Sequence, residues 1–471
     1  MNRYRSLIII FTGALFLYGC KITKPYEKPE LSASYKDSLY RDAAIEDTAT
    51  IADLPWQRLF SDPKLQLLIS EGLANNLDLK IALERIHEAE ALLTQSRMAF
   101  FPTLNFSPSV TLAKTSRAAL NLPPNININL KTMTYQVGIS TNWEADIWGK
   151  MASAKRASLA NLMKTQAARK ALETQIIAAI ANSYYSLLVL DRQLAITEAT
   201  IGLRRKNVET IKKLKESAVV TGAAVVQSEG NLYAAEVSIP DLKRGIRELE
   251  NALNVVLGRH PQPIGRNTLD EQPVLTELKT GVPLQLLQNR PDVAAAELAY
   301  RAAFENVNTA KTYFYPSLAI TAGSGGFSTL ASNSIFTNSL FYSLVGGLTQ
   351  PIFNKGANKA RLETAKAQRE MALQAFYQSI LTAGQEVSDA LFSYEMGIEK
   401  ENTRKKQIDA LEKAVNYTEQ LMRYSSATNY TDVLTSEQAL LAAQLAGISD
   451  RQQQLMAIVE LYRALGGGWK Q

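Results

Sequence analysis

The side chains that most often carry out chemistry are scarce in this sequence of 471 residues. There are two histidines, His87 and His260, and neither stands in a metal-binding spacing. The sequence contains neither a phosphate-binding glycine loop nor a nucleophile elbow. His87, among Glu84, Arg85 and Glu88, is interpreted as a solvated or packed helix residue. The sequence therefore predicts a protein that is not an enzyme, with no cofactor and no metal site.

Cys20 is the single cysteine, and it is the one residue for which a covalent modification is predicted. Arg3 and Arg5 precede an apolar stretch from Leu7 to Leu17, which is too short to span a bilayer as a helix and indicates a signal peptide. The stretch ends in Leu17-Tyr18-Gly19-Cys20, which resembles a bacterial lipobox, although a tyrosine stands where a small residue is usual. In a lipobox the cysteine is acylated, for example with palmitate. The alternative is a free cysteine beside an ordinary cleavage site.

The composition is that of a globular chain, with 46% hydrophobic and 20% charged residues. This balance argues against a disordered chain and against a polytopic helical membrane protein. Lys and Arg exceed Asp and Glu by 51 to 45, and this excess is too small and too dispersed to indicate nucleic-acid binding. No disulfide is predicted, because no second cysteine is present.

Four segments alternate between apolar and polar residues, as amphipathic strands do. After the signal peptide no segment reaches about eighteen consecutive apolar residues, so membrane entry would require a β-barrel. The two clearest strands run from Leu104 to Leu112 and from Met133 to Glu144. A weaker pair comprises Leu318 to Thr321 and a segment that includes Tyr342, Leu344 and Leu348. Polar loops are expected at residues 115–131 and 323–339.

Two helices of unusual length follow the strand pairs. Residues 150–217 contain Gly202 as their one breaker, and residues 355–424 contain three glycines and no proline. At 1.5 Å per residue each would be about 100 Å long. Shorter returning helices are predicted from Val226 to Leu257 and from Asp432 to Leu465, with Gly258 and Gly466 as C-cap signals.

The same order of elements occurs twice, and short motifs recur with it. Phe101-Pro102-Thr103-Leu104 returns as Tyr315-Pro316-Ser317-Leu318, and Val256-Leu257-Gly258 returns as Ala464-Leu465-Gly466. Duplication is the economical interpretation. Four strands cannot close a barrel, so the chain is expected to oligomerise, with eight, twelve or sixteen strands as the open alternatives. The helices would continue from the strands as a hollow cylinder, which predicts a conduit.

With these motifs, the sequence resembles the outer-membrane efflux factors of TolC type, and in particular their lipoprotein branch. The resemblance covers essentially the whole mature chain, and its most specific segments are 142–150, 289–297, 351–356 and 461–469. It implies a mixed α and β membrane protein: a homotrimer with a twelve-stranded outer-membrane β-barrel, four strands per chain, continued by a long periplasmic α-helical barrel. It also implies docking to a periplasmic adaptor and an inner-membrane pump, and export of small molecules such as drugs or metal ions.

The resemblance also suggests functional positions. The closed periplasmic gate would lie at the tips of the helical hairpins, at residues 217–226 and 425–432, and an N-cap role explains Asp432 equally well. Arg290 and Asp292 are expected to form a structural ion pair. Trp143 and Trp148 are expected to anchor the barrel at the membrane interface. The gate candidates are Tyr424, Asp432, Thr435, Thr221 and Gly222.

Two rival functions remain: an exit duct for protein secretion, and a coiled-coil lipoprotein that tethers envelope layers without transport.

The expected organisation of the chain follows from these elements. The predicted parts are a signal peptide (1–19), a lipid-anchored extended segment (20–62), a first repeat (63–258), a Pro-rich linker (259–283), a second repeat (284–466) and a C-terminal tail (467–471).

Overall fold

The computed structural model describes residues 22–30, 51–120, 123, 126, 128–273, 289–330, 339–424 and 430–469. The chain divides into two compact units. The first comprises residues 1–29, 86–164 and 297–375, and the second comprises residues 30–85, 165–296 and 376–471. Cys20 and the predicted signal peptide lie outside the described residues.

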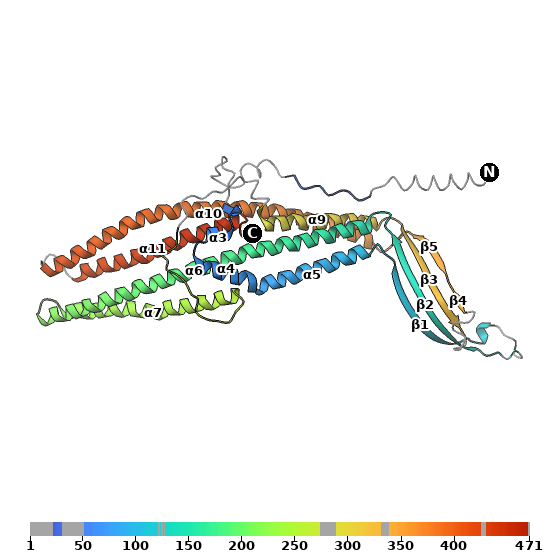
Figure 1. Ribbon diagram of the computed structural model, residues 1–471, viewed down its shortest axis with the longest axis horizontal. Helices are drawn as coiled ribbons and strands as arrows, with labels where there is room; N and C mark the ends of the chain where they lie inside the picture. The colour runs from blue at the N-terminus through green and yellow to red at the C-terminus, as the bar shows by residue number, and fades with distance from the viewer. Residues whose placement is uncertain are drawn as a thin grey trace. The chain divides into compact units, whose positions relative to one another are not determined.

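The first unit contains one antiparallel sheet. Its strands are β1 (Thr103–Lys114), β2 (Lys131–Ala145), β3 (Ser317–Thr329), β4 (Leu340–Phe341) and β5 (Leu344–Thr349). They lie in the order β1-β2-β3, and β4 and β5 both pair with β3. Figure 1 shows these strands side by side. A short 3-10 helix, η2 (Ala118–Leu120), interrupts the connection between β1 and β2.

Two features of the sheet differ from the sequence prediction. The third strand continues to Thr329 and so includes residues that were expected to form a loop. The fourth strand is broken at Tyr342, which lies between β4 and β5 and belongs to neither. The register between β2 and β3 shifts after Ile139, opposite the glycine-rich residues 323–326. A β-bulge at glycines bends a strand locally and interrupts the alternation of apolar and polar residues. This explains why the alternation did not predict the limits of the third and fourth strands.

Four helical stretches accompany the sheet in the first unit. They belong to α5 (Leu77–Met98), α6 (Lys150–Glu216), α9 (Pro291–Thr312) and α10 (Ala357–Tyr424). Apolar contacts join α5 to α6 through Leu93 and Leu162, and α9 to α10 through Val307 and Ala365. An ion pair joins α6 to α9: the Arg156 Nε donates to Glu305 Oε1 at 2.7 Å.

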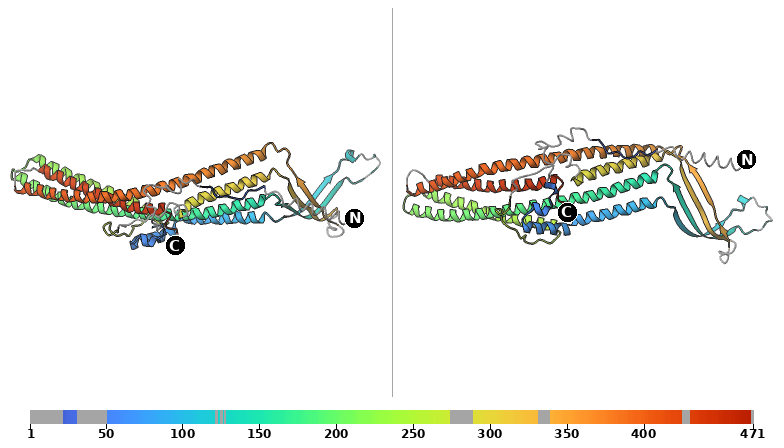
Figure 2. Two further views of the ribbon diagram at one scale, coloured as in Figure 1. Left: turned by 90° about the horizontal axis from the view of Figure 1, so that it is seen from above. Right: turned by 45° about the horizontal axis from the view of Figure 1, so that its top comes forward.

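The second unit holds two helical hairpins around one apolar core. The first hairpin is α6 with α7 (Gly222–Val256), and the second is α10 with α11 (Tyr430–Ala464). Both can be followed in the two views of Figure 2. The short helices η1 (Ile51–Asp53), α3 (Trp56–Leu59) and α4 (Pro63–Asn75) pack on them. The largest core side chains include Leu65, Ile69, Ile180, Tyr184, Leu253, Phe376 and Tyr462.

The predicted helices are confirmed to within a few residues. The long helices end at Glu216 and Tyr424, close to the expected limits. Both C-cap glycines are confirmed by positive φ, 69° at Gly258 and 81° at Gly466. The part of the predicted linker from Arg259 to Pro273 packs against the hairpins, because Ile264 and Leu269 are buried in the core.

Candidate membrane sheet, helix tips and N-terminal strap

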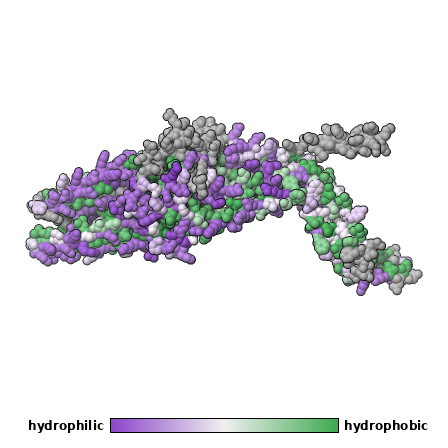
Figure 3. All heavy atoms as spheres, in the orientation of Figure 1, coloured by the Kyte–Doolittle hydropathy of each residue, from purple (hydrophilic) through white to green (hydrophobic). Residues whose placement is uncertain are grey.

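One face of the sheet is apolar over its whole width. Directly paired residues share a face, and the pairs on this face include Phe106 with Ile139 and Leu318 with Leu348. Leu104 is 74% exposed in the single chain although it is a large apolar residue. Figure 3 shows hydrophobic residues spread over the strands. An apolar exposed face of this extent requires a non-aqueous neighbour or a partner. The apolar residues of β1 and β2 on this face are Leu104, Phe106, Pro108, Val110, Leu112, Met133, Tyr135, Val137, Ile139, Trp143 and Ala145; Thr141 lies among them, and Lys114 and Lys131 pair at its far end.

The opposite face of the sheet carries mostly polar side chains and glycines. Thr103 pairs with Asn142 and Ser109 with Gln136 on this face. Gly138 pairs with Gly326, where a Cβ built on Gly326 would lie 2.0 Å from the carbonyl oxygen of Val137. The two faces therefore differ in the way expected of a sheet with lipid on one side and water on the other.

The sheet has two open edges among the described residues. β1 pairs on one side with β2, and its other side carries no strand; β4 and β5 likewise pair on one side with β3. Unpaired edge groups are a site of strand addition in water and cost several kcal/mol each in lipid. The edges are therefore incomplete in one copy of the chain.

The two tryptophans near the sheet bind the backbone. The indole Nε1 of Trp143 donates to the carbonyl oxygen of Phe100 at 2.8 Å, just before β1. The indole Nε1 of Trp148 donates to the carbonyl oxygen of Pro316 at 2.7 Å, just before β3. Each tryptophan thus satisfies a carbonyl where a helix passes into a strand, a role that the sequence did not reveal.

The gate candidates lie at or next to the ends of the hairpins. Tyr424 is the last residue of α10 and is 85% exposed. Asp432 is exposed in the first turn of α11, which begins at Tyr430, so the alternative that Asp432 is the N-cap is wrong. A carboxylate in a first turn still interacts favourably with the helix dipole. Thr435 is exposed one turn later, and its hydroxyl donates to the carbonyl oxygen of Thr431.

The first hairpin turns at residues 217–221. Thr221 is the N-cap residue of α7 but makes no capping hydrogen bond with its side chain, and Gly222 is the first helical residue; both are exposed. Ala218 has φ of 58°, in the left-handed region that favours glycine. The amide of Val219 donates to the carbonyl oxygen of Leu214, which completes the C-terminal turn of α6.

The tips of the two hairpins pack against each other. Ile211 of α6, Val225 of α7 and Leu434 of α11 form one apolar cluster. Behind it the Asn207 amide donates to Glu437 Oε1 at 2.7 Å, and Glu437 is only 7% exposed. Burial, together with the nearby Glu419, raises the pKa of Glu437. Sequence reasoning did not identify Glu437, because its partner lies 230 positions away.

An N-terminal strap, residues 22–30, lies against α9. Asn308 is 1% exposed and makes two bonds with the strap backbone: it accepts from the amide of Lys24 at 3.2 Å and donates to the carbonyl oxygen of Lys24 at 2.9 Å. Tyr26 packs edge-on against Phe304, and Lys28 pairs with Glu297 at 2.6 Å. These contacts fix the position of the strap along the helix.

The expected pair of Arg290 and Asp292 is confirmed, and it belongs to a larger network. Arg290 is 4% exposed and binds Asp292 at 2.5 Å, Glu386 at 2.6 Å and the carbonyl oxygen of Ala464 at 3.0 Å. Arg463 binds the other oxygen of Glu386 at 3.0 Å. Burial raises the pKa of Asp292, but the hydrogen bonds and positive charge of Arg290, together with backbone amide hydrogen bonds, outweigh it and lower the pKa overall. The network ties the start of α9 to the end of α11.

Two searches of the described residues found nothing. None of the described helices is both long enough and apolar enough to cross a membrane. In the same residues, no three side chains of His, Cys, Asp or Glu are grouped so that they could hold a metal ion.

A two-faced sheet joined to long paired helices is the fold of outer-membrane channels. The solved structure of the outer-membrane channel OprN superposes with a TM-score of 0.87, at 24% sequence identity, over 96% of this chain and all of that one. The chain belongs to the outer membrane efflux protein family, whose sequence profile matches residues 68–259 and 282–467.

Curated relatives match along their whole length. The toluene efflux pump outer membrane protein TtgC of Pseudomonas putida is 28% identical over 470 residues, which cover 99% of this chain and 96% of the relative. The probable outer membrane lipoprotein SilC of Salmonella typhimurium is 27% identical and covered to 99%. The chain is thus the outer-membrane component of an efflux system, and its family is one of transport components, not of enzymes.

Proposed function

We propose that three copies of this chain join their sheets edge to edge into a closed twelve-stranded barrel in the outer membrane, with β4 and β5 counted as one strand. The observation that carries this proposal is the sheet itself, which has one apolar face, one polar face and two unpaired edges. Closure removes every edge, and lipid then covers the apolar face while water fills the lumen. The long helices would form the periplasmic tunnel below it.

The second half of the chain repeats the first in our interpretation. The element order α5-β1-β2-α6-α7 is followed by α9-β3-β4/β5-α10-α11. Gly258 and Gly466 close the two returning helices with the same left-handed backbone. These correspondences favour an internal duplication, with a first repeat at 63–258, a linker at 259–283 and a second repeat at 284–466.

The duct is closed at the hairpin tips in this proposal. Tyr424, Asp432 and Thr435 on the second hairpin and Thr221 and Gly222 on the first are the candidate gate residues, and all five are exposed in the single chain. The tips would also meet the periplasmic adaptor and the inner-membrane pump. The exported cargo would be small molecules, such as drugs or metal ions, because relatives are named as the outer membrane protein of an antibiotic efflux pump and as a cation efflux system protein.

The lipid anchor has geometric support. Thr23, at the start of the strap, lies beside Gly149, between the end of β2 and the start of α6. Cys20 is three residues earlier, within about 10 Å along an extended chain. Acyl chains on Cys20 would therefore emerge at the level where the sheet begins, at the membrane surface. Trp143 and Trp148 lie at the same junctions and would sit in the interfacial region.

Single-channel conductance in a planar bilayer tests the duct and its gate. Small, rarely open currents are expected for the wild type, and large, stable currents for the double variant Asp432→Gly with Tyr424→Ala. If correctly assembled protein conducts in neither form, the conduit proposal is wrong and the envelope tether becomes the better hypothesis.

A matched pair of adjacent residues tests the faces of the sheet. Phe106→Arg places a charge on the apolar face and is expected to cost about 2 kcal/mol or more in lipid. Ser107→Arg places the same charge on the polar face, next to it in sequence. Only the first variant should reduce the amount of assembled protein in the outer membrane; an equal reduction by both would contradict the assignment of the faces.

A further inference from the structure

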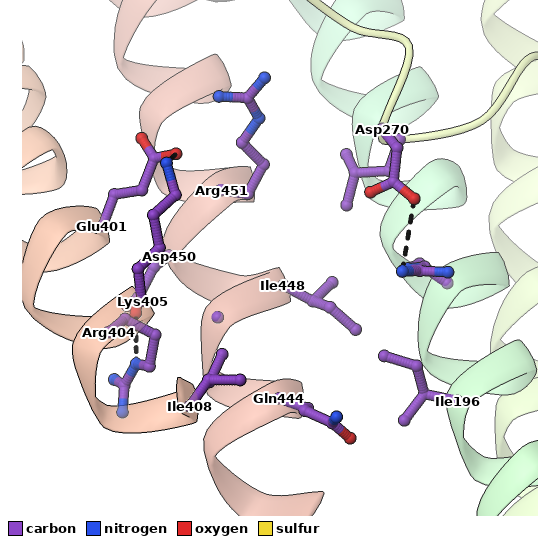
Figure 4. Close-up of a pocket in the computed structure, with 13 residues that line it drawn as sticks. Ile196, Asp270, Glu401, Arg404, Lys405, Ile408, Gln444, Ile448, Asp450 and Arg451 are labelled. Atoms are coloured by element: carbon purple, nitrogen blue, oxygen red, sulfur yellow. Dashed lines mark hydrogen bonds and ion pairs between the residues drawn. The ribbon is translucent and has the colours of Figure 1, made fainter. Parts of the chain in front are cut away.

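A cavity in the second unit lies between the two hairpins. Its volume is about 440 Å³, within the range of small-molecule sites in proteins. Four segments line it: α6, the packed residues 269–270, α10 and α11. Figure 4 shows Ile448 of α11 and Ile196 of α6 directed toward each other, with Ile408 of α10 beside α11. The centre of the cavity is therefore apolar.

Charged side chains surround this apolar centre. The lining includes four cations, Arg192, Arg404, Lys405 and Arg451, and three carboxylates, Asp270, Glu401 and Asp450. Each carboxylate is paired with a cation: Arg192 lies 3.4 Å from Asp270, Lys405 lies 2.9 Å from Glu401, and the Arg404 Nε donates to Asp450 at 2.8 Å. The lining thus carries one more positive charge than negative.

Arg451 supplies the cation that these three pairs leave over. Its guanidinium donates to the carbonyl oxygen of Gln272 at 2.7 Å and weakly to Gln454 Oε1 at 3.4 Å, so it is held in place by neutral acceptors. Its positive charge also acts on the nearby Glu401. In Figure 4 the guanidinium of Arg451 points along α11 away from Ile448 and Ile196, so it lies at the polar end of the cavity lining. A guanidinium that is already positioned is suited to bind a carboxylate or a sulfonate.

We propose that this cavity binds a small amphipathic anion, with one carboxylate or sulfonate near Arg451 and an apolar body among Ile196, Ile408 and Ile448. The site does not depend on the proposed duct, because all of its lining belongs to the second unit of one chain.

Gly447 offers a way to fill the cavity without unfolding the protein. It is a lining residue within α11, and a Cβ built on it would lie 3.4 Å from Arg404 Cγ and 3.5 Å from Ile408 Cδ1. Gly447→Leu would extend into the cavity, and it replaces a poor helix former with a good one. Loss of binding in this variant would therefore not reflect a weaker helix.

The test is equilibrium dialysis of 2-naphthalenesulfonate against the full chain in lipid nanodiscs, with empty nanodiscs subtracted. We expect saturable binding of one anion per chain, loss of binding in Gly447→Leu, and binding about tenfold weaker or more in Arg451→Gln. The control Lys400→Gln removes an exposed cation that directly precedes the lining residue Glu401 but does not itself line the cavity, and it should bind as the wild type does. The neutral analogue 2-naphthalenemethanol should bind at least tenfold more weakly than the sulfonate.

Three results would overturn the proposal. They are the absence of saturable binding up to millimolar anion, equal binding in wild type and Gly447→Leu, and equal binding of the neutral analogue. Because dialysis measures binding and not current, the outcome is separate from that of the conductance experiment. A protein that conducts but does not bind the anion would contradict this site and leave the duct intact.

Discussion

The two returning helices, α7 and α11, each end at a glycine with positive φ, Gly258 and Gly466, that packs closely against another segment. We call each of these places a joint; the two joints share their backbone geometry but are held by different side chains. A Cβ on Gly258 would lie 2.5 Å from the carbonyl oxygen of Asn75, and a Cβ on Gly466 would lie 2.6 Å from the carbonyl oxygen of Asn289. In both joints the chain therefore approaches the segment that precedes a helix leading toward the sheet.

The side chains at these joints use different chemistry for the same task. The amide of Asn76 donates to the carbonyl oxygen of Val256 at 2.8 Å, and its oxygen accepts from the amide of Leu79. Arg290 donates to the carbonyl oxygen of Ala464 and also binds two carboxylates. The comparison teaches that the backbone geometry of the joint is shared, whereas the first joint is neutral and the second is ionic.

The largest expected effect comes from removing the ionic side chain. Arg290→Met leaves Asp292 without its guanidinium and the carbonyl oxygen of Ala464 without this donor, which should cost about 3–5 kcal/mol. Asn76→Ala should cost about 1–2 kcal/mol, as loss of a helix cap does. Urea unfolding in detergent, followed by circular dichroism, measures both. Equal losses of unfolding free energy in the two variants would contradict the difference between an ionic and a neutral joint.

The shared backbone predicts equal costs at the two glycines. Gly258→Ala and Gly466→Ala each place a Cβ against a carbonyl oxygen and require an L-residue at positive φ, so each should lose about 2 kcal/mol or more. Gly202→Ala, where a Cβ would meet nothing within 4 Å, is the matched control and should be neutral or stabilising. A harmless substitution at either joint would contradict the geometry described for it.

Low pH should destabilise the second, ionic joint more than the first, neutral joint. The folded-state pKa of Asp292 is lowered, so its contribution to stability is present above the ordinary value of 3.8 and is lost as the pH falls through the lowered pKa. Between pH 5 and pH 3, wild type should therefore lose more stability than Asp292→Asn. The thermal midpoint of each protein at the two pH values gives this difference, and identical pH profiles would show that the ionic joint does not depend on Asp292.

The smallest effect is expected at the hairpin tips, where the second half again buries a carboxyl group. The folded-state pKa of Glu437 is raised above 4.5, so its stabilising contribution is complete below that value and is lost as the pH rises through the raised pKa. Glu437→Gln keeps an acceptor for Asn207 and should raise the thermal midpoint at pH 7.5 with little change at pH 4. A lower midpoint in the variant at pH 7.5 would show that the charged form is favoured by the fold.

Much of the helical framework could be predicted from the sequence, because its signals are local. The long helices lack proline, Gly258 and Gly466 mark the ends of the returning helices, and the alternation from Leu104 to Leu112 identifies β1. The ion pair of Arg290 and Asp292 was expected for the same reason, since the two residues are neighbours on the chain.

The contacts that position the site could not be predicted, because they join distant residues. Asn308 meets Lys24 across 284 positions, and Arg290 meets Glu386 across 96. The break at Tyr342 lies opposite the bulge of β3, and the alternation of apolar and polar residues does not reveal it. The cavity at Arg451 requires four segments to meet, and no single segment carries a motif for it.

Closure of the sheet is the central claim, and thiol cross-linking across its edges tests it most directly. Cysteines at Thr103, Asn105 or Ser107 on the edge strand β1 would each be combined with Val345→Cys on β5, which lies on the same polar face. With a short bifunctional thiol reagent, the account predicts that at least one combination gives covalent species up to three chains and none larger, while the single variants give no such species. Failure of all combinations, or a ladder that continues beyond three chains, would contradict the closed trimer.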